Sequence, residues 1–328
     1  MGVMRRVAAL ALCSVLACSS PPARVPGKIT VEPYLGVEPA LNLLAPAAKV
    51  KAVVVPQAAG RVVSYSLGGE NILYNPLRDG RLQAEGGFGL DLGPERTIPP
   101  HPTLWKGRHV WALLGDVITV TSERDPAVGM RVGKNIMIDG ATGALDLLLR
   151  MTNVSDREQA WCFWDRTLCR AGGFGLIPLN PKSRLPAGWA LGTRRGPLWW
   201  DYDGKTPSHP DIRVMNGVLV TRARGSEQKV GADSDAGWIA YVLGRLLFVK
   251  YYLYVPDGTY VDNGFSVAHY FNDTIAELEP LSPAARLKPE GEYVFPEHWT
   301  LTLLDREVTT PEEARALVDR IPPYSFGR

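Results

Sequence analysis

The chain has 328 residues, of which 45% are hydrophobic, and this is enough to build a large buried core. Its 36 basic and 34 acidic residues leave a net charge of +2, so the sequence lacks the clustered positive charge that is typical of nucleic-acid-binding proteins. The 33 glycines and 27 prolines favour short strands and many turns over long helices.

The N-terminus has the order of an export signal. Arg5 and Arg6 precede an apolar run, residues 7–17, which is shorter than the roughly 20 residues that a membrane-spanning helix needs. The run ends in "VLAC", which resembles a bacterial lipobox, and this resemblance implies that Cys18 is lipidated and becomes the first residue of the mature protein. Because Leu16 stands where such motifs usually have a small residue, an ordinary cleaved signal is the alternative.

These features predict the layout of the chain. Residues 1–18 are expected to form a lipoprotein signal peptide, residues 19–29 a flexible tether, and residues 30–328 a single β domain. We expect the protein to be exported to the cell envelope and anchored by its lipid in a bacterial membrane, where it faces the periplasm or the exterior.

Strand-like segments dominate the rest of the chain. The two glycines at 68–69 form a hairpin turn signal. Apolar or alternating runs of strand length lie within residues 49–56, 60–75, 116–123, 143–155, 158–169, 212–223, 237–256, 264–283 and 292–305. No repeat of fixed period and no Pro-rich break separates them. The pattern therefore predicts one large, antiparallel, all-β domain.

Only the C-terminal segment predicts a helix. Thr309 or Thr310 is the expected N-cap, and Pro311 occupies the first turn. Glu312 and Glu313 follow, where their negative charge interacts favourably with the positive end of the helix dipole.

The middle of the chain, residues 171–235, is rich in Gly, Pro and aromatic residues and predicts long loops. Long loops on a rigid β scaffold often carry function. Trp199 and Trp200 fit two roles there: a stacking wall for a sugar ring, or the packing of a loop onto the sheet.

Cys162 and Cys169 are the only cysteines after the signal. Export allows a disulfide between them, two buried thiols are the alternative, and the spacing does not decide between these. No CxxC or histidine pair accompanies them, so a zinc site is not predicted. The sequence shows no nucleotide-binding loop and no nucleophile motif, and we expect no metal and no cofactor.

Three segments, in this order, resemble the galactose-mutarotase-like superfamily of carbohydrate-binding proteins. They are the hairpin at residues 60–75, "LDLLLRMTNVSDREQAW" at 145–161 and the closing hairpin at 275–304. The element "LDLGPERTIPP" at 90–100 is most similar to that of an exported bacterial branch without an assigned activity. The resemblance implies a large antiparallel β-supersandwich with a short C-terminal helix, which binds a carbohydrate in a groove of its concave sheet.

The resemblance also implies a catalytic base. In aldose 1-epimerases of this superfamily, the glutamate of an "LE" pair takes the proton of the anomeric hydroxyl while a histidine protonates the ring oxygen. Glu279 matches that base, and Glu277, two residues earlier on the same strand face, is placed to raise its pKa. Where the family has its histidine, this chain has Asp165 and Arg166. Arginine does not deprotonate, so the candidate acids are Asp165 and His101.

Charged residues inside apolar strands complete the candidate site. Lys250 interrupts "LLFVKYYLYV" and either pairs with one of the two glutamates across the sheet or points outward from an edge. We expect Asp165 and Arg166 to contact the ligand beside these groups, with Arg61 and Trp105 at the rim. Arg61, Arg166 and Lys250 together would favour an acidic ligand, such as a uronate or a sulfated or phosphorylated sugar.

Three functions stay open from the sequence. The first is an exported carbohydrate-binding protein, and the second is an active aldose 1-epimerase with Glu279 as its base. The third is a structural envelope lipoprotein whose charged strand face is an ion-paired network without a ligand. The first two predict a cleft at Glu279, whereas the third predicts that Glu279 is salt-bridged and sealed. The sequence does not identify the sugar.

Overall fold

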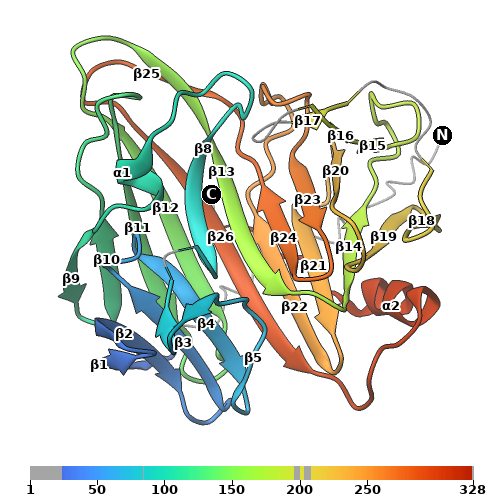
Figure 1. The fold of residues 1–328 in the computed structure, drawn as a ribbon, viewed down its shortest axis with the longest axis horizontal. Coiled ribbons are helices and arrows are strands. Elements are labelled where there is room, and N and C mark those ends of the chain that lie inside the picture. The colour runs from blue at the N-terminus through green and yellow to red at the C-terminus, as the bar shows by residue number, and fades with distance from the viewer. Residues whose placement is uncertain (1–23, 84, 196–199, 203–207, 327–328) are drawn as a thin grey trace, which may run out of the picture.

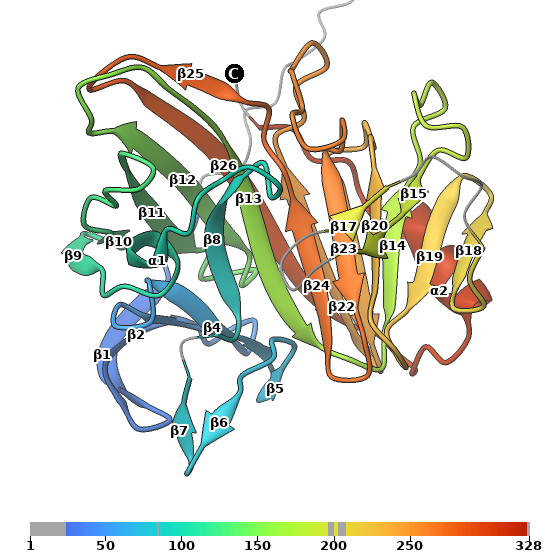
Figure 2. The ribbon, with the colours of Figure 1, turned by 45° about the horizontal axis from the view of Figure 1, so that its top comes forward.

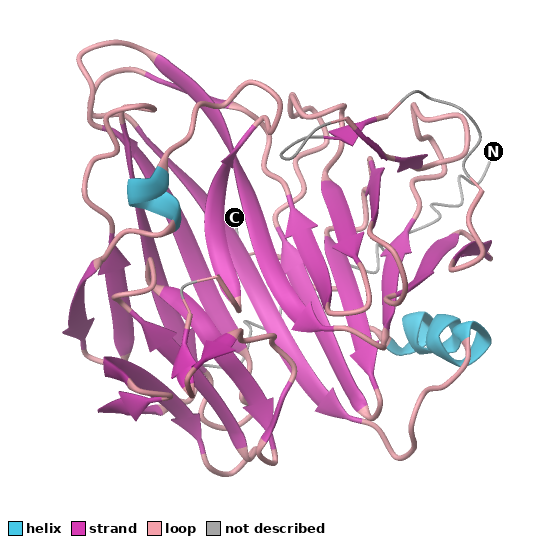
Figure 3. Ribbon diagram, viewed as in Figure 1, coloured by secondary structure: helices cyan, strands magenta, loops and turns pink. Residues whose placement is uncertain are grey.

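Two large β-sheets form the body of the protein (Figure 1). The computed structural model describes residues 24–83, 85–195, 200–202 and 208–326. Helical structure in these residues is confined to α1 (Pro102–Trp105), α2 (Pro311–Leu317) and the 3₁₀ turn η1 (Val318–Arg320) (Figure 3). None of the described helices combines the length and the apolar character that crossing a membrane requires.

The twelve-stranded sheet, called sheet A below, places strands from distant parts of the chain side by side. Its order is β1 (Lys28–Tyr34), β2 (Val37–Ala45), β3 (Val50–Val55), β4 (Arg61–Leu67), β8 (Phe88–Gly93), β13 (Gln159–Arg170), β24 (Ile275–Pro280), β23 (Val267–Phe271), β20 (Gln228–Ala232) and β15 (Ala190–Leu191), with β5 (Glu70–Asn71) on β4 and β25 (Ala285–Leu287) on β13. All of these pairings are antiparallel.

The ten-stranded sheet, called sheet B below, covers one face of sheet A. Its order is β18 (Ile212–Met215), β19 (Val218–Arg222), β14 (Phe174–Pro178), β21 (Trp238–Leu243), β22 (Leu246–Tyr252), β26 (Glu292–Leu303), β12 (Leu145–Asn153), β11 (Met130–Ile138), β10 (Val117–Thr121) and β9 (Val110–Leu114). Two small ribbons, β6 (Leu77–Arg78) with β7 (Arg81–Leu82) and β16 (Thr193–Arg194) with β17 (Trp200–Asp201), complete the described strands.

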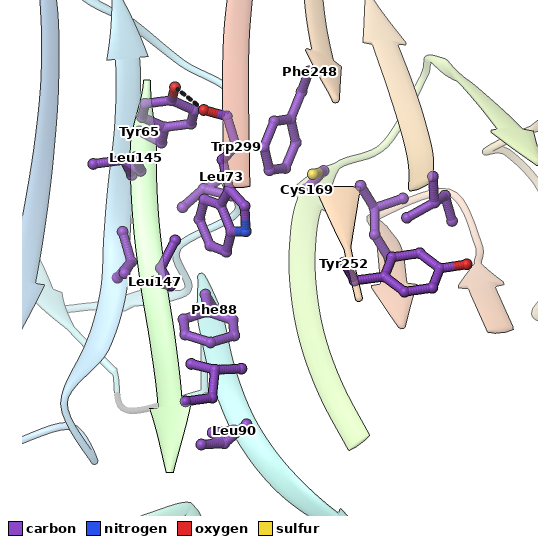
Figure 4. Close-up of a cluster of buried hydrophobic side chains, with 14 of the residues drawn as sticks. Tyr65, Leu73, Phe88, Leu90, Leu145, Leu147, Cys169, Phe248, Tyr252 and Trp299 are labelled. Carbon is purple, nitrogen blue, oxygen red and sulfur yellow. Dashed lines mark hydrogen bonds between the residues drawn. The ribbon is translucent and has the colours of Figure 1, made fainter. Parts of the chain in front are cut away.

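The two sheets bury a continuous apolar core between them. Near its centre the Trp299 ring lies 5.1 Å from Phe88 and 5.4 Å from Phe248, measured between ring centroids (Figure 4). The Tyr65 hydroxyl donates a hydrogen bond to the carbonyl of Trp299 at 3.2 Å. Since side chains alternate along a strand, the residues between the core positions of sheet A point to its opposite face. We call that face, which sheet B does not cover, the open face.

The predicted fold class and the predicted local signals are confirmed. The two glycines at 68–69 have positive φ and turn the chain from β4 into β5. Helix α2 starts after Thr310, whose hydroxyl accepts a hydrogen bond from the backbone N–H of Glu313. The Glu313 carboxylate accepts one from the N–H of Thr310 in return, and Leu317 packs α2 against sheet B.

The two mature cysteines are free, buried thiols. Cys162 and Cys169 lie on the same strand, β13, seven residues apart. An extended strand separates such residues by about 23 Å, which is far beyond the reach of a disulfide. The separation excludes the disulfide, so the structure shows the second alternative, two buried thiols. Burial raises the pKa of the Cys162 thiol to about 12.

Residues 24–29, the end of the expected tether, are held against the domain. The Arg24 guanidinium pairs with Asp116 and donates to the carbonyl of Ile138 at 3.0 Å. Side-chain and strand contacts thus hold the described end of this segment, from Arg24 onward, against the domain. The predicted signal peptide, Cys18 and the start of the tether lie outside the described residues.

Candidate functional site

The open face of sheet A carries a band of charged side chains at its centre. On β13, Trp164 and Arg166 point to this face, because Asp165 between them points into the core. The strand register places Trp164 opposite Asp91 of β8. On the other side, the pairing of β13 with β24 puts Glu279 beside Arg166.

A cavity of about 510 Å³ opens on this face, next to β8 and α1. Its volume lies within the range of small-molecule sites. The segment that follows β8 forms its wall, and Arg166 reaches it from β13. The polar and aromatic side chains around it are Asp91, Glu95, Arg96, His101, Trp105, Lys106 and Arg166.

Asp91 is the centre of an ion-paired cluster in the cavity. Arg166 Nε lies 3.2 Å from Oδ2 of Asp91, and His101 Nε2 forms a hydrogen bond with Oδ1. Burial acts to raise the pKa of Asp91, but Arg166 and His101 outweigh it and hold that pKa below its usual value. Burial acts to lower the pKa of His101, and Asp91 outweighs it and raises that pKa. The contacts thus favour the charged form of each partner.

Both ring nitrogens of His101 face oxygen acceptors. Nε2 faces the Asp91 carboxylate, and Nδ1 lies 2.8 Å from the carbonyl oxygen of Pro99. Only the doubly protonated ring donates to both. His101 is therefore fixed as a cation that ties the cavity wall to β8, and in this arrangement neither ring nitrogen is directed at a ligand.

A second cluster surrounds Glu279. Its Oε2 accepts a hydrogen bond from the Trp164 indole at 2.6 Å and lies 3.2 Å from Lys229 Nζ. Lys229 also donates to Glu95 at 3.1 Å. Burial acts to lower the pKa of Lys229, but Glu279 and Glu95 outweigh it and raise that pKa. The Glu279 side chain has no exposed surface and does not line the cavity, so this carboxylate is sealed and salt-bridged.

Cations and aromatic rings alternate across the open face. Lys229 Nζ lies 4.5 Å from the centroid of the Trp164 ring, and the Arg166 guanidinium lies 5.2 Å from the same ring. Arg166 is also 5.4 Å from the Trp105 ring, which the Arg61 guanidinium approaches to 4.2 Å. These cation–π contacts hold the five side chains in a fixed row.

Glu277 is the partly exposed member of the glutamate pair. Burial and the charge of Glu279 raise its pKa to about 7, although Arg166 and Lys229 act in the opposite direction. Burial and Glu95 likewise raise the pKa of a nearby carboxyl, that of Asp262, to about 7. The open face therefore holds carboxyl groups that change charge close to neutral pH.

The structure brings three of the predicted site residues together. His101, Trp105 and Arg166 meet at the cavity, although they come from segments some 60 residues apart in the sequence. Glu277 and Glu279 lie on the same face, beside the cavity and outside its lining. The roles that we assigned to these residues in binding or catalysis stay predictions.

Lys250 lies between the sheets, where it does not reach the open face. Its ammonium group pairs with Asp165, donates to Thr167 at 2.7 Å and lies 3.4 Å from Glu297. Burial lowers the pKa of Lys250 to about 8, although Glu297 acts to raise it. Neither of the two alternatives for Lys250, pairing with a glutamate of β24 or pointing outward from an edge, is correct, because β22 belongs to sheet B and directs this side chain to the inner face.

Asp165 is likewise placed away from the cavity. It has no exposed surface and forms the buried pair with Lys250. Asp165 and Arg166 are consecutive residues of one strand, so that they point to opposite faces. The two were expected to share the site, and alternation allows only Arg166 to reach it.

Arg61 lies behind the cavity wall, and the expectation that it sits at the rim is wrong. Its side chain is fully buried beneath Trp105 and donates to the carbonyl of that residue at 3.4 Å. Burial lowers the pKa of Arg61 to about 10, although Asp91 acts to raise it. The indole ring that was expected beside Arg61 instead covers it.

The middle loop packs on the open face next to β20 and β23. The Trp200 ring contacts Tyr270 edge-to-face at 6.0 Å, and the Tyr202 ring contacts Phe265 at 4.8 Å. Of the two roles considered for Trp200, the structure therefore shows the packing of a loop onto the sheet. Trp199 lies outside the described residues.

Sequence reasoning missed four members of the two clusters. Asp91 and Glu95 belong to the "DLGPE" element, whose two carboxylates flank the end of β8 and were a usable signal. Trp164 and Lys229 carried no such signal, because a tryptophan in an apolar run is ordinary core, and Lys229 follows three polar residues, where an exposed lysine is ordinary. Only strand pairing shows that they converge on Glu279.

No protein-family model and no curated protein matches the sequence. Solved structures do match its fold. A galactose mutarotase-like protein from Clostridium acetobutylicum is 11% identical with a TM-score of 0.54, over 85% of this chain and 99% of that one. A galactose mutarotase-like protein from Lactobacillus casei is 11% identical with a TM-score of 0.54, over 78% of this chain and 98% of that one.

A TPR-domain containing protein from Parabacteroides distasonis is 16% identical with a TM-score of 0.53, over 80% of this chain. The match spans about half of that longer protein, 47% of its length. These sequence identities are too low to transfer an activity from one protein to another. The structural matches establish the architecture alone. The chain has the galactose mutarotase-like β-sandwich fold.

Proposed function

We propose that the protein is an exported, lipid-anchored carbohydrate-binding protein whose ligand occupies the cavity beside β8 and α1. The observation that carries the proposal is the cavity itself, which combines an aromatic ring, Trp105, with fixed charged donors and acceptors at Arg166 and Asp91. Sugars expose apolar ring faces and many hydroxyl groups, so a site of this composition suits them. The mutarotase-like fold supports the same class of ligand.

The three cations that suggested an acidic sugar do not meet at the cavity. Of the three cations that suggested an acidic ligand, only Arg166 lines the cavity. Its guanidinium already faces Asp91 at 3.2 Å and Glu95 at 3.5 Å. Arg96 and Lys106 line the cavity as well, so we propose no preference between neutral and acidic sugars, and the binding screen includes both.

Two features argue against epimerase chemistry at this site. Glu279, the matched base, is sealed beneath Trp164 and paired with Lys229. His101, the candidate acid, has both ring nitrogens engaged. General acid–base catalysis needs both groups within hydrogen-bond reach of the substrate, and this arrangement offers neither.

A structural envelope protein is the second candidate. The ion-paired and sealed Glu279 is the state that this function predicts. The two candidate functions differ in one respect. A purely structural protein does not require a cavity lined by Trp105 and Arg166.

Sugar binding is tested by a glycan-binding screen of the full-length chain, followed by calorimetric titration of any ligand found. Trp105→Ala should weaken binding by roughly tenfold or more, because it removes the aromatic wall. Trp111→Ala is the matched control, since this tryptophan is 37% exposed on β9, outside the cavity lining. Absence of any ligand in the screen would favour the structural protein.

A mutarotation assay tests the epimerase alternative. We expect no acceleration with freshly dissolved aldoses, either for the native chain or for Glu279→Gln. Acceleration that is lost in Glu279→Gln would restore Glu279 as a base and would require the open face to rearrange on binding.

A further inference from the structure

Strand β9 is an exposed apolar edge of sheet B. It is the last strand of the sheet, and all five of its residues are exposed and apolar, in the sequence "VWALL". Val110 and Leu114 are each 65% exposed, Leu113 40% and Trp111 37%. An uncovered edge strand of this kind is a ready site for association. We call these five residues the hydrophobic edge.

The hydrophobic edge is apolar on both of its faces. Its partner is β10, where Ile118 and Val120 are buried and Val117 is partly exposed. The register pairs Leu113 with Ile118 and Trp111 with Val120, so these two side chains extend the core face beyond the covered region. The strand therefore projects past the core, and in both ribbon views it lies at one extremity of the molecule (Figures 1 and 2).

The N-terminal segment joins the domain beside this edge. Arg24 pairs with Asp116 in the turn between β9 and β10, and the neighbouring Val25 is 49% exposed. Cys18, the predicted lipidation site, is six residues before Arg24. Six residues span at most about 20 Å, so that a lipid on Cys18 keeps Arg24, which contacts the turn after β9, within that distance of the membrane.

The charge around the edge suits a lipid surface. Residues 108–121 contain one basic residue, Arg108, and one acidic residue, Asp116, apart from a buried histidine. The ion pair with Arg24 neutralises Asp116, which leaves the exposed Arg108 to face anionic headgroups. A tryptophan among leucines and valines, flanked by arginine, is the composition of segments that lie in membrane interfaces.

We propose that the hydrophobic edge docks on the surface of the lipid bilayer that carries the anchor, with Trp111 and the β9–β10 turn at the level of the headgroups. A second copy of the chain is a weaker occupant, because five residues are far fewer than the roughly 20–30 per partner of a stable interface. Since β9 begins five residues after α1, docking also holds the wall of the cavity close to the membrane.

The test compares two positions on opposite edges of sheet B. The full chain, exported and processed in a bacterium, carries either Val110→Cys or Val214→Cys, each labelled with an environment-sensitive fluorophore. Val214 is the matched control, because it is 50% exposed on β18, the other edge strand. Cys162 and Cys169 are buried, and the unsubstituted chain reports any background labelling.

Both labelled proteins are mixed with vesicles of phosphatidylethanolamine and phosphatidylglycerol, with and without a nitroxide quencher on the acyl chains. We expect the proteins to float with the vesicles. The label at residue 110 should shift to the blue and lose about half of its emission to the lipid quencher, because it lies at the interface. The label at residue 214 should do neither.

Three results would overturn the proposal. The first is failure of the processed chain to float with the vesicles. The second is equal quenching at residues 110 and 214, or none at 110. The third is a blue shift at residue 110 that grows with protein concentration without vesicles, which would assign the edge to a second copy of the chain. The inference rests on the lipid anchor of the proposed function, and failure to float would contradict that anchor too, whereas absent quenching at residue 110 in a chain that floats would contradict the docking alone. Sugar binding is measured separately.

Discussion

Two identical side chains, two residues apart on β24, meet different surroundings. Glu279 is covered by Trp164 and neutralised by Lys229. Glu277 keeps some exposure and has a pKa of about 7, raised by burial and by the charge of its neighbour. The difference arises because the rings and cations of the open face gather over one end of the strand. At the scale of the residue, the pKa values of this face make the clearest predictions.

Glu277→Gln should stabilise the protein at pH 8 and leave it nearly unchanged at pH 4. A carboxyl whose pKa is raised in the folded state does not destabilise the fold below its ordinary pKa of 4.5, where it is protonated in both states. It destabilises the fold increasingly as the pH rises from 4.5 to about 7, because ionisation then favours the unfolded state. We expect a gain of about 1–2 kcal/mol at pH 8, less than the full shift implies, because water reaches this side chain. Urea unfolding at the two pH values measures it, and a variant that is no more stable at pH 8 contradicts the prediction.

His101→Gln should destabilise the protein more at pH 6 than at pH 9. The pKa of His101 is raised in the folded state by Asp91, so its stabilising effect is complete below its ordinary value of 6.5 and disappears as the pH rises through the raised value. A hydrogen bond between charged groups is worth about 2 kcal/mol. Urea unfolding between pH 5 and pH 9 tests this, and in that range Asp91 stays ionised since its pKa is lowered. An equal loss at both ends would show that the ring acts by packing alone.

At the scale of the element, the segment after β8 combines three tasks. It supplies Glu95 to Lys229, returns His101 to Asp91 of β8, and continues from His101 into α1, which carries Trp105. These contacts explain how a stretch with little regular structure forms a fixed cavity wall. Local sequence signals work best in the opposite situation, where an element is specified by its own residues, as in α2.

Thr310→Ala should lower the free energy of unfolding by about 1 kcal/mol, the usual value of an N-cap. The Thr310 hydroxyl accepts the N–H of Glu313, and this bond is lost in the variant. Thr310→Ser retains the hydroxyl and is the matched control. Thermal or urea denaturation measures both, and equal stability of the alanine and serine variants would argue that α2 is held by Leu317 and its packing alone.

At the scale of the whole molecule, a buried ion pair links the two sheets. Lys250 of sheet B reaches Asp165 and Thr167 of sheet A through the apolar core. The same strand, β13, thus bears the inter-sheet contact on one face and Arg166 of the cavity on the other. The core contact and the candidate site are separated by the thickness of one sheet.

Lys250→Met should destabilise the protein strongly without changing ligand affinity. Removal of one partner leaves Asp165 as an unpaired buried charge, at a cost of about 3–5 kcal/mol. The double variant Lys250→Met with Asp165→Leu should recover part of that loss. Urea unfolding measures the stability, and titration with the ligand of the native chain measures the affinity. A lower affinity of the folded variant would return Lys250 to the binding site.

The sequence by itself determined the fold class, the C-terminal helix and several members of the site. Strand periodicity, glycine turns and the Thr310 cap act over a few residues, so a linear pattern contains them. The order of three motifs added the mutarotase-like architecture, which the solved structures support. The same resemblance singled out Arg166, at the position of the family's histidine, and made His101 a substitute acid, and the structure places both beside Trp105 at the cavity.

Only the tertiary structure decided which charges share a face and which are sealed. Arg166 meets Asp91 and Lys229 meets Glu279 across strands that are 50 to 75 residues apart in the sequence. Such pairs depend on strand order and register, and a shift of one residue in register exchanges the two faces of a sheet. For this reason the sequence placed Lys250 and Asp165 with the cavity residues, while the paired sheets enclose them in the core.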